Sequence, residues 1–229
     1  MYQNEYVSQT LTSTVSSTMK RVYMKMTLGL LVTALTAFWA AGSASYLTFL
    51  MGHAWLMWVL VFAELGLVIA ISGAINKLSS GVASLLFYLF AVVNGLMLCT
   101  IFLEYSPAAI AKTFFITAGT FGAMSVYGYF TTNDLSKFGT YLFMALIGLI
   151  IASVVNIFAR STGLEWIISI AGVLIFIGLT AWDTQKIKQM AMMAPAESVS
   201  KLATVGALSL YLDFINLFLY LLRFFGNRD

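Results

Sequence analysis

The sequence has few of the charged residues that a water-soluble protein needs. Only 9% of its 229 residues are charged, whereas 61% are hydrophobic. A soluble domain carries about 25% charged residues. So few charges cannot cover a globule in water, and the composition predicts an integral membrane protein in contact with the lipid bilayer. The net charge of +3 is small and scattered, which argues against a nucleic-acid partner.

Cysteine, histidine and proline are also scarce. The single cysteine, Cys99, lies inside an apolar run, which excludes a disulfide framework and a thiolate metal cluster. The single histidine, His53, has no acidic residue beside it and is a poor metal ligand on its own. We therefore predict no cofactor. The two prolines, Pro107 and Pro195, fall in expected loops and leave the apolar runs uninterrupted.

Long apolar runs dominate what is present. They indicate helices, because a transmembrane barrel would show short alternating segments. Seven runs approach the roughly 20 residues that cross a bilayer: Met24–Ala44, Trp55–Ala74, Gly81–Leu103, Ala108–Phe130, Phe138–Phe158, Leu164–Trp182 and Ala203–Phe225. We predict an all-α, seven-helix transmembrane domain over residues 20–229. Residues 1–19 are polar and rich in Ser and Thr, which predicts a short, mobile cytoplasmic arm.

The basic residues predict the orientation. With the N-terminus in the cytoplasm, eight of the twelve Lys and Arg residues lie inside: Lys20, Arg21, Lys25, Lys77, Lys137, Lys186, Lys188 and Lys201. The count becomes ten if the last segment enters the membrane and returns. Charge alone therefore leaves open whether the last segment fully spans.

Three carboxylates interrupt the apolar runs: Glu64, Asp183 and Asp213. An ionised Asp at the centre of a membrane helix costs about 2.5–3.5 kcal/mol. These side chains are therefore expected to face the protein interior or water.

The last run carries a polar stripe. Ser209, Asp213, Asn216, Tyr220 and Arg223 are spaced by three or four residues, so they share one helical face. Asp183 ends the preceding run on the cytoplasmic side, and Asp213 lies on the order of 15 Å into the next helix from that same side. Two such carboxyl groups in contact would share a proton, which makes a pH sensor. Each could instead be structural, with Asp183 at the interface near Lys186.

Three stretches carry a family resemblance. "AWDTQKI", "ALSLYLDFINLFLYLLRFFG" and "AELGLV" together resemble the Bax inhibitor-1 family, and the short N-terminus and minimal loops resemble its bacterial branch. The resemblance implies a last helix wrapped by the other six and a pH-sensitive calcium leak governed by an aspartate pair. That pair corresponds to Asp183 and Asp213, and the acid of the second helix to Glu64.

The same resemblance exposes one departure. Some bacterial relatives carry an Arg near the cytoplasmic end of the second helix that latches onto the aspartate pair. Here the aligned residue is Ile75, and the nearest cation is Lys77. Lys is a point charge without the two-pronged fork of Arg, so Lys77 is a candidate gating residue of a different kind.

The leading hypothesis is a passive, pH-regulated leak for Ca²⁺ or a similar cation. Hard cations prefer oxygen ligands, and Glu64, Asp183, Asp213 and Asn216 would offer successive weak contacts rather than one tight metal site. The alternative is a regulatory protein that binds a membrane-bound protease and conducts no ions. We expect no enzyme, because neither aspartate lies in a Tyr-Asp or Gly-x-Gly-Asp setting of intramembrane proteases. The absence of Asn-x-Ser/Thr sites fits a bacterial inner membrane.

Overall fold

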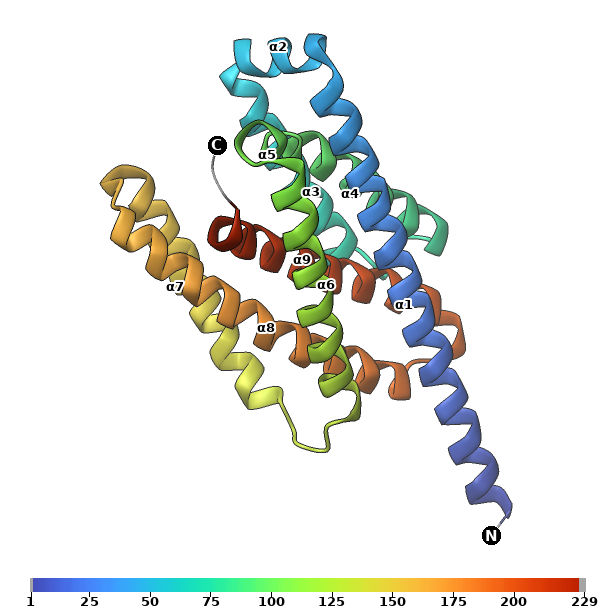
Figure 1. The fold of residues 1–229 in the computed structure, drawn as a ribbon. Helices are drawn as coiled ribbons and strands as arrows, with labels where there is room; N and C mark the ends of the chain where they lie inside the picture. The colour runs from blue at the N-terminus through green and yellow to red at the C-terminus, as the bar shows by residue number, and fades with distance from the viewer. Residues whose placement is uncertain (1, 227–229) are drawn as a thin grey trace. The chain divides into compact units, whose positions relative to one another are not determined.

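The computed structural model describes the backbone of residues 2–226 and the side chains of residues 12–195 and 197–226. All elements in this part of the chain are helical (Figure 1). They are α1 (Tyr2–Gly42), α2 (Ala44–Gly52), α3 (Ala54–Gly73), α4 (Ser80–Leu98), α5 (Ile101–Glu104), α6 (Pro107–Phe130), α7 (Ser136–Ala159), α8 (Thr162–Met193), a 3-10 turn (Ala196–Ser198) and α9 (Val199–Phe225).

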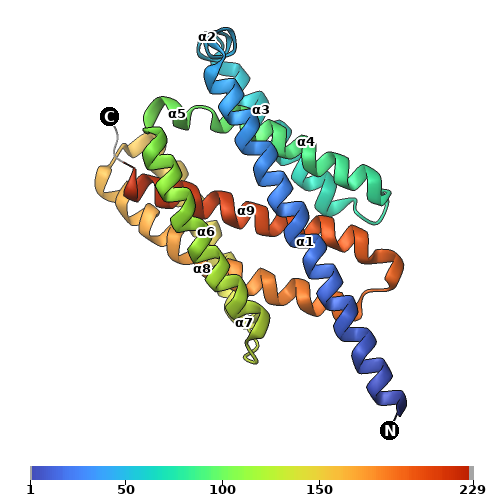
Figure 2. The same cartoon turned by 45° about the vertical axis from the view of Figure 1, so that its right-hand side comes forward.

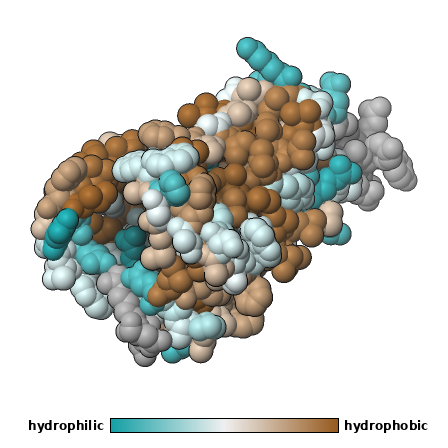
Figure 3. Space-filling view, turned by 90° about the horizontal axis from the view of Figure 1, so that it is seen from above, coloured by the Kyte–Doolittle hydropathy of each residue, from teal (hydrophilic) through white to brown (hydrophobic). Residues whose placement is uncertain are grey.

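Seven of these helices are long and apolar enough to cross a membrane: α1 from Thr12 onward, α3, the stretch Ser80–Glu104, α6, α7, α8 and α9. This confirms the predicted all-α, seven-span fold class. Much of their apolar surface is uncovered, since only 11% of the most apolar window of α3 and of α7 is buried. Figure 3 shows apolar side chains, in brown, over much of the face in view. Such a surface suits lipid and not water.

Several boundaries differ from the sequence-based expectation. The predicted polar arm is helical from Tyr2, and Val15, Thr18 and Met19 within it are buried. Val15, Met19, Val22 and Met26 recur every three or four residues and form an apolar stripe that the surrounding Ser and Thr residues obscure. The arm is therefore helical and not irregular, while its mobility and its place in the cytoplasm stay predictions.

The eighth helix is also longer than predicted, because it continues past Trp182 to Met193. Asp183 therefore lies within a helix and not at its edge. The first loop contains the short helix α2, whose first turn is capped by the Ser43 hydroxyl accepting from the Tyr46 N–H.

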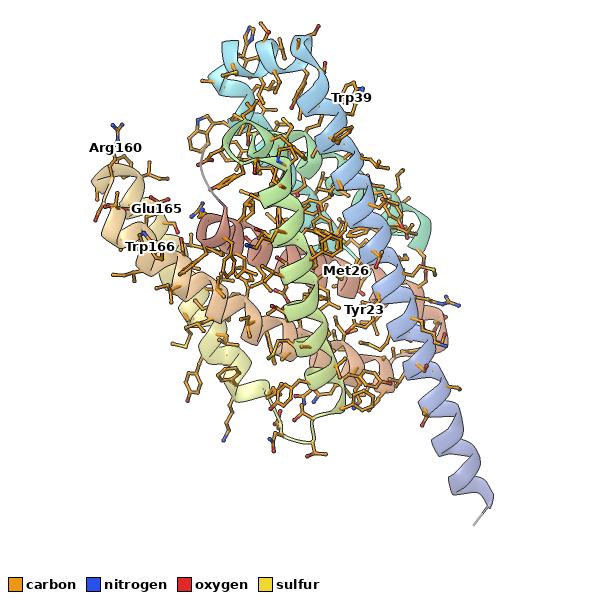
Figure 4. The ribbon with its side chains drawn as sticks, viewed as in Figure 1. Tyr23, Met26, Trp39, Arg160, Glu165 and Trp166 are labelled. Carbon is orange, nitrogen blue, oxygen red and sulfur yellow. The ribbon has the colours of Figure 1, made fainter. Side chains whose placement is uncertain are left out.

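Local signals explain several helix ends. Ser79 and Ser106 cap α4 and α6, and Pro107 occupies the first position of α6. Arg160 ends α7 in the left-handed region with φ of 48°, and its backbone N–H donates to Asn156 O. Figure 4 shows the Arg160 side chain extending away from the turn between α7 and α8. The polar turn therefore closes without interrupting either apolar helix.

The chain forms two compact units, each described by itself. Unit 1 comprises Met1–Glu104 and Met190–Tyr211, and unit 2 comprises Tyr105–Gln189 and Leu212–Asp229. The helices α8 and α9 each contribute residues to both units. The single transmembrane domain predicted for residues 20–229 stays a prediction.

Unit 1 is built on the packing of α4 against α1 and α3, and α1 and α4 run side by side in both ribbon views (Figures 1 and 2). Gly95 of α4 allows the close approach to α1. A Cβ atom there would lie 2.7 Å from Thr33 O and from the Thr36 side chain. A small residue at this crossing is the usual means of bringing two membrane helices together.

Unit 2 packs α6, α7 and α9 around α8. Gly128 of α6 lies against the Ala181 backbone, and Gly139 of α7 lies against the Trp182 ring. Tyr220 of α9 stacks on Phe176 of α8 with ring centroids 5.9 Å apart. Of the seven spans, α9 has the highest buried share, 67% of its window.

Candidate functional site

The structure brings Asp183 and Asp213 together in unit 2. Tyr220 of α9 stacks on Phe176 of α8, and the rings of Phe224 on α9 and Trp166 on α8 have centroids 4.8 Å apart. Because the later residue of α9 meets the earlier residue of α8, the two helices run antiparallel. From the Phe176–Tyr220 contact, seven residues forward on α8 give Asp183 (176 + 7), and seven residues back on α9 give Asp213 (220 − 7). Seven residues are about two helical turns, which returns both side chains to the shared face. The Asp183 charge acts directly on the Asp213 carboxyl group.

The surroundings of Asp213 are apolar. Only 5% of the residue is exposed, and Phe214 beside it packs on Phe114 and Phe121 of α6, each with ring centroids 5.4 Å away. In this packing the Oδ2 atom of Asp213 is buried and has no hydrogen-bond partner among the described residues. A negative charge on this Oδ2 atom would therefore have no hydrogen bond from the described residues to stabilise it.

Asp183 has a cation beside it. The Lys186 charge acts on the Asp183 carboxylate from the next turn of α8, and its ammonium group lies over the Trp182 ring, 4.7 Å from the centroid. Asp183 is partly exposed, whereas Asp213 is buried. The pair therefore has one open member and one enclosed member.

Further unpaired polar atoms occur in unit 2. Among the described residues, the buried side-chain atoms without a hydrogen bond are Thr113 Oγ1 and Ser125 Oγ on α6, Thr184 Oγ1 on α8 and Asp213 Oδ2 on α9. An unpaired buried group costs about 1–3 kcal/mol. All four atoms belong to unit 2, so its interior contains hydrogen-bonding atoms that its described side chains leave unsatisfied.

Asn216 does not join the aspartate pair through its amide nitrogen. That nitrogen donates to Leu212 O, one turn earlier on the same helix, at 2.8 Å. Its predicted role as an ion contact rests on the amide oxygen alone.

Glu64 and Lys77 belong to unit 1. Glu64 Oε1 accepts a hydrogen bond from Asn94 Nδ2 of α4 at 2.8 Å. Lys77 lies exposed in the turn after α3, where its backbone N–H donates to Ala74 O at 2.8 Å. Their predicted roles toward the aspartate pair, as ion contact and as latch, stay predictions.

Among the described residues, no group of three or more His, Cys, Asp or Glu side chains lies close enough together to hold a metal ion. The donor set of the pair is two carboxyl groups, which suits a proton or a passing hard cation.

Gln185, two residues after Asp183, was not predicted to belong to the site. Its Oε1 accepts from the Leu135 N–H at 2.9 Å, and its Nε2 donates to Asn133 O at 2.8 Å. Lys188 adds a bond to Tyr129 O at 2.6 Å. These contacts fasten the loop between α6 and α7 to α8 next to Asp183. The polar sequence "DTQKIK" inside a helix was the available signal.

Sequence reasoning also read Lys25 only as a topology signal. Its ammonium group donates to Ser84 Oγ and Thr204 Oγ1, both at 2.6 Å, and so joins α1, α4 and α9 within unit 1. Asn94, Tyr211 and Thr33 form a second polar cluster in that unit, which no sequence motif indicated.

The fold and the buried acids define a helical, multi-span membrane protein. A family model described as "Inhibitor of apoptosis-promoting Bax1" matches residues 15–229. The chain therefore belongs to the Bax inhibitor-1 family, as the sequence resemblance predicted.

Bacterial proteins are similar over nearly the whole chain. The inner membrane protein YbhL of Escherichia coli strain K12 is 51% identical over 213 residues, which cover 92% of this chain and 91% of YbhL. A protein of Borreliella burgdorferi is 49% identical over 210 residues, covering 91% and 90% of the two chains. A protein of Deinococcus radiodurans is 39% identical over 230 residues, covering 100% and 98%.

Proposed function

We propose that this protein is a passive, pH-regulated leak for Ca²⁺ or a similar cation, controlled by the Asp183–Asp213 pair. The observation that carries the proposal is the buried Asp213 carboxyl, whose Oδ2 atom has no partner among the described residues while the Asp183 charge acts on it. Two carboxyl groups in contact do not both ionise cheaply, so they hold one proton between them.

The proposed gate uses the single negative charge that remains on the pair. In the ionised state this charge holds a cationic side chain, for which Lys186 is the neighbour on α8 and Lys77 the candidate from sequence. Acid neutralises the pair and releases that cation. The expected sign is therefore more leak at lower pH.

We place the protein in the bacterial inner membrane with its N-terminus in the cytoplasm. The name of the Escherichia coli relative supports the membrane, and the excess of Lys and Arg on one side supports the orientation. The proposal assigns no catalytic step and no bound cofactor, with Ca²⁺ as the transported ion.

A Ca²⁺ flux assay in vesicles tests the proposal. The purified protein is reconstituted, and entry of Ca²⁺ is followed with an enclosed dye at neutral and acidic pH. Wild-type protein should conduct more at acidic pH, and Asp183→Asn and Asp213→Asn should each abolish the difference. Flux in both variants that keeps the wild-type pH response would remove the gate from contention.

Asp134→Asn is the matched control. Asp134 is an exposed Asp in the loop between α6 and α7, and hydrogen bonds from Ser136 lower the pKa of its carboxyl group. It lies in an exposed loop outside the pair and is not expected to carry the pH response. The control variant should behave as wild type.

The same preparation tests the regulatory alternative. Co-purification with a membrane-bound protease, together with no flux from the pure wild-type protein at either pH, would favour a protein that acts through a partner.

A further inference from the structure

Unit 1 contains a continuous chain of hydrogen-bonding side chains across four helices. Glu64 Oε1 on α3 lies 2.8 Å from Asn94 Nδ2 on α4, and Asn94 Oδ1 lies 3.0 Å from the Tyr211 hydroxyl on α9. The Tyr211 hydroxyl lies 2.6 Å from Thr33 Oγ1 on α1, which lies 2.8 Å from Ala91 O on α4. Asn94, Tyr211 and Thr33 are buried. The chain has four contacts, and each needs one hydrogen atom.

An ionised Glu64 leaves this chain one hydrogen short. The carboxylate only accepts, so Asn94 must direct its N–H to Glu64 and its oxygen to Tyr211. Tyr211 then donates to Asn94, and Thr33 holds the one remaining hydroxyl hydrogen. That hydrogen serves either Tyr211 or Ala91 O. Three hydrogens are available for four contacts, so in one contact two oxygen atoms face each other with no hydrogen between them.

A protonated Glu64 completes the chain. The two ends of an amide have the same shape, so turning the Asn94 amide over keeps every heavy-atom distance. Glu64 then donates to Asn94 Oδ1, Asn94 donates to Tyr211, Tyr211 donates to Thr33, and Thr33 donates to Ala91 O. Four hydrogens fill four contacts, and all run in one direction.

The surroundings of Glu64 supply no positive charge to hold an anion. No Lys or Arg pairs with it in the described part of unit 1, and its neighbours on α3, Phe62 and Leu65, are exposed as lipid-facing residues are. The other described titratable groups of unit 1 are Lys20, Arg21, Tyr23, Lys25, Tyr46, His53, Lys77, Tyr88, Cys99, Glu104, Glu197, Lys201 and Tyr211. Of these, Tyr211 interacts electrostatically with Glu64.

Two ammonium groups of unit 1 have hydrogen-bond partners other than Glu64. Lys25 donates to Ser84 and Thr204, and Lys201 donates to Asn76 O. An ionised Glu64 in this position would carry the cost of a charge in a membrane helix.

We propose that Glu64 holds a proton at neutral pH and donates it to Asn94, which makes the Glu64–Asn94–Tyr211–Thr33 chain a second proton-binding site, in unit 1. Loss of this proton turns the Asn94 amide and breaks one contact between α1 and its neighbours. The inference does not depend on the proposed leak. In its protonated state Glu64 offers Ca²⁺ an oxygen dipole and no charge.

Infrared spectroscopy of the full-length protein in lipid vesicles at neutral pH tests this site. A protonated carboxyl group absorbs at a higher frequency than the peptide band, and a carboxylate does not absorb in that higher-frequency region. The wild-type spectrum should contain a component that Glu64→Gln removes. Glu197→Gln, which alters an exposed glutamate, should retain it, and so should Asp183→Asn and Asp213→Asn. Identical wild-type and Glu64→Gln spectra in this region would overturn the proposal.

A stability measurement accompanies the spectra. Gln at position 64 donates to Asn94 as a protonated Glu does, so the thermal midpoint of Glu64→Gln should match that of wild type at neutral pH. If that variant fails to fold, Tyr211→Phe supplies the test, because it shortens the chain beyond Asn94 and should shift the carboxyl band. A carboxyl band that is absent, or unmoved by Tyr211→Phe, contradicts the assignment.

Discussion

The two units treat their buried polar groups in opposite ways. In unit 1, Glu64, Asn94, Tyr211 and Thr33 form one chain in which each side chain contacts the next. In unit 2, Asp213 and hydroxyl groups on α6 and α8 keep buried atoms without partners among the described residues. A closed network holds helices together, whereas an open one leaves acceptors for protons or ions. The difference supports the proposal that the response of the leak to pH belongs to the aspartate pair of unit 2.

The largest effect should come from combining substitutions at the aspartate pair. If Asp183 and Asp213 share one proton, removing either carboxyl destroys the pH response, and removing both adds nothing further. Ca²⁺ flux at acidic and neutral pH should therefore be equally pH-insensitive in both single variants and in the Asp183→Asn/Asp213→Asn double variant. Additive, independent effects would mean two separate titrating groups.

The next effect tests how the loop beside the pair is held. Gln185→Leu should lower the free energy of unfolding by about 1–3 kcal/mol, because it leaves the buried Leu135 N–H without its acceptor. Gln185→Glu keeps an acceptor for Leu135 but loses the donor to Asn133 O, so it should also lower stability. Denaturation in detergent measures both variants. Equal stability of Gln185→Leu and wild type would show that the Gln185 hydrogen bonds to the loop between α6 and α7 do not stabilise the protein.

A matched pair of isosteric substitutions sharpens the comparison directly. Thr33→Val removes a hydroxyl that makes two contacts in unit 1 and should destabilise the protein by about 1 kcal/mol or more. Thr113→Val removes a buried, unpaired hydroxyl in unit 2 and should be neutral or stabilising by up to about 1 kcal/mol. Thermal midpoints of the two variants check the signs. The reverse order would erase the distinction between the units.

The smallest effect concerns Asp134 in the loop between α6 and α7. Its pKa is lowered by hydrogen bonds from Ser136. A lowered pKa in the folded state adds stability above the unfolded pKa, which is lost as pH falls through the folded pKa. Asp134→Asn should therefore reduce stability only slightly near neutral pH, and less still in strong acid. The thermal midpoint, measured across that range, checks the trend.

Much of the architecture could be predicted from the sequence. Apolar runs that are long enough to cross a bilayer as a helix are typical of membrane spans, so the seven spans could be predicted. The N-terminal helix was missed because Val15 and Met19 stand among Ser and Thr residues, where packing and not composition decides the fold. The end of α8 was missed because charged residues mark an interface in sequence, yet a helix continues through an interface easily.

For the site too, some residues could be predicted from the sequence and others could not. Asp183 and Asp213 could be paired from the sequence because an antiparallel turn fixes which residues of neighbouring helices face each other. The contacts of Gln185 with Leu135 and Asn133, and of Asn94 with Tyr211, join residues far apart in the chain. No local period encodes such contacts, so the sequence offered no route to them.

The most direct test of the central claim is the number of protons that the aspartate pair holds at neutral pH. Infrared spectra of Glu64→Gln protein, in which the glutamate contribution is removed, should still contain the signal of one protonated carboxyl group. Asp213→Asn in that background should remove that signal, because it removes the enclosed carboxyl group, whereas Asp183→Asn should retain it, because burial alone disfavours a charge on Asp213. Absence of a protonated carboxyl signal in Glu64→Gln protein, with both aspartates ionised at neutral pH, would contradict the account.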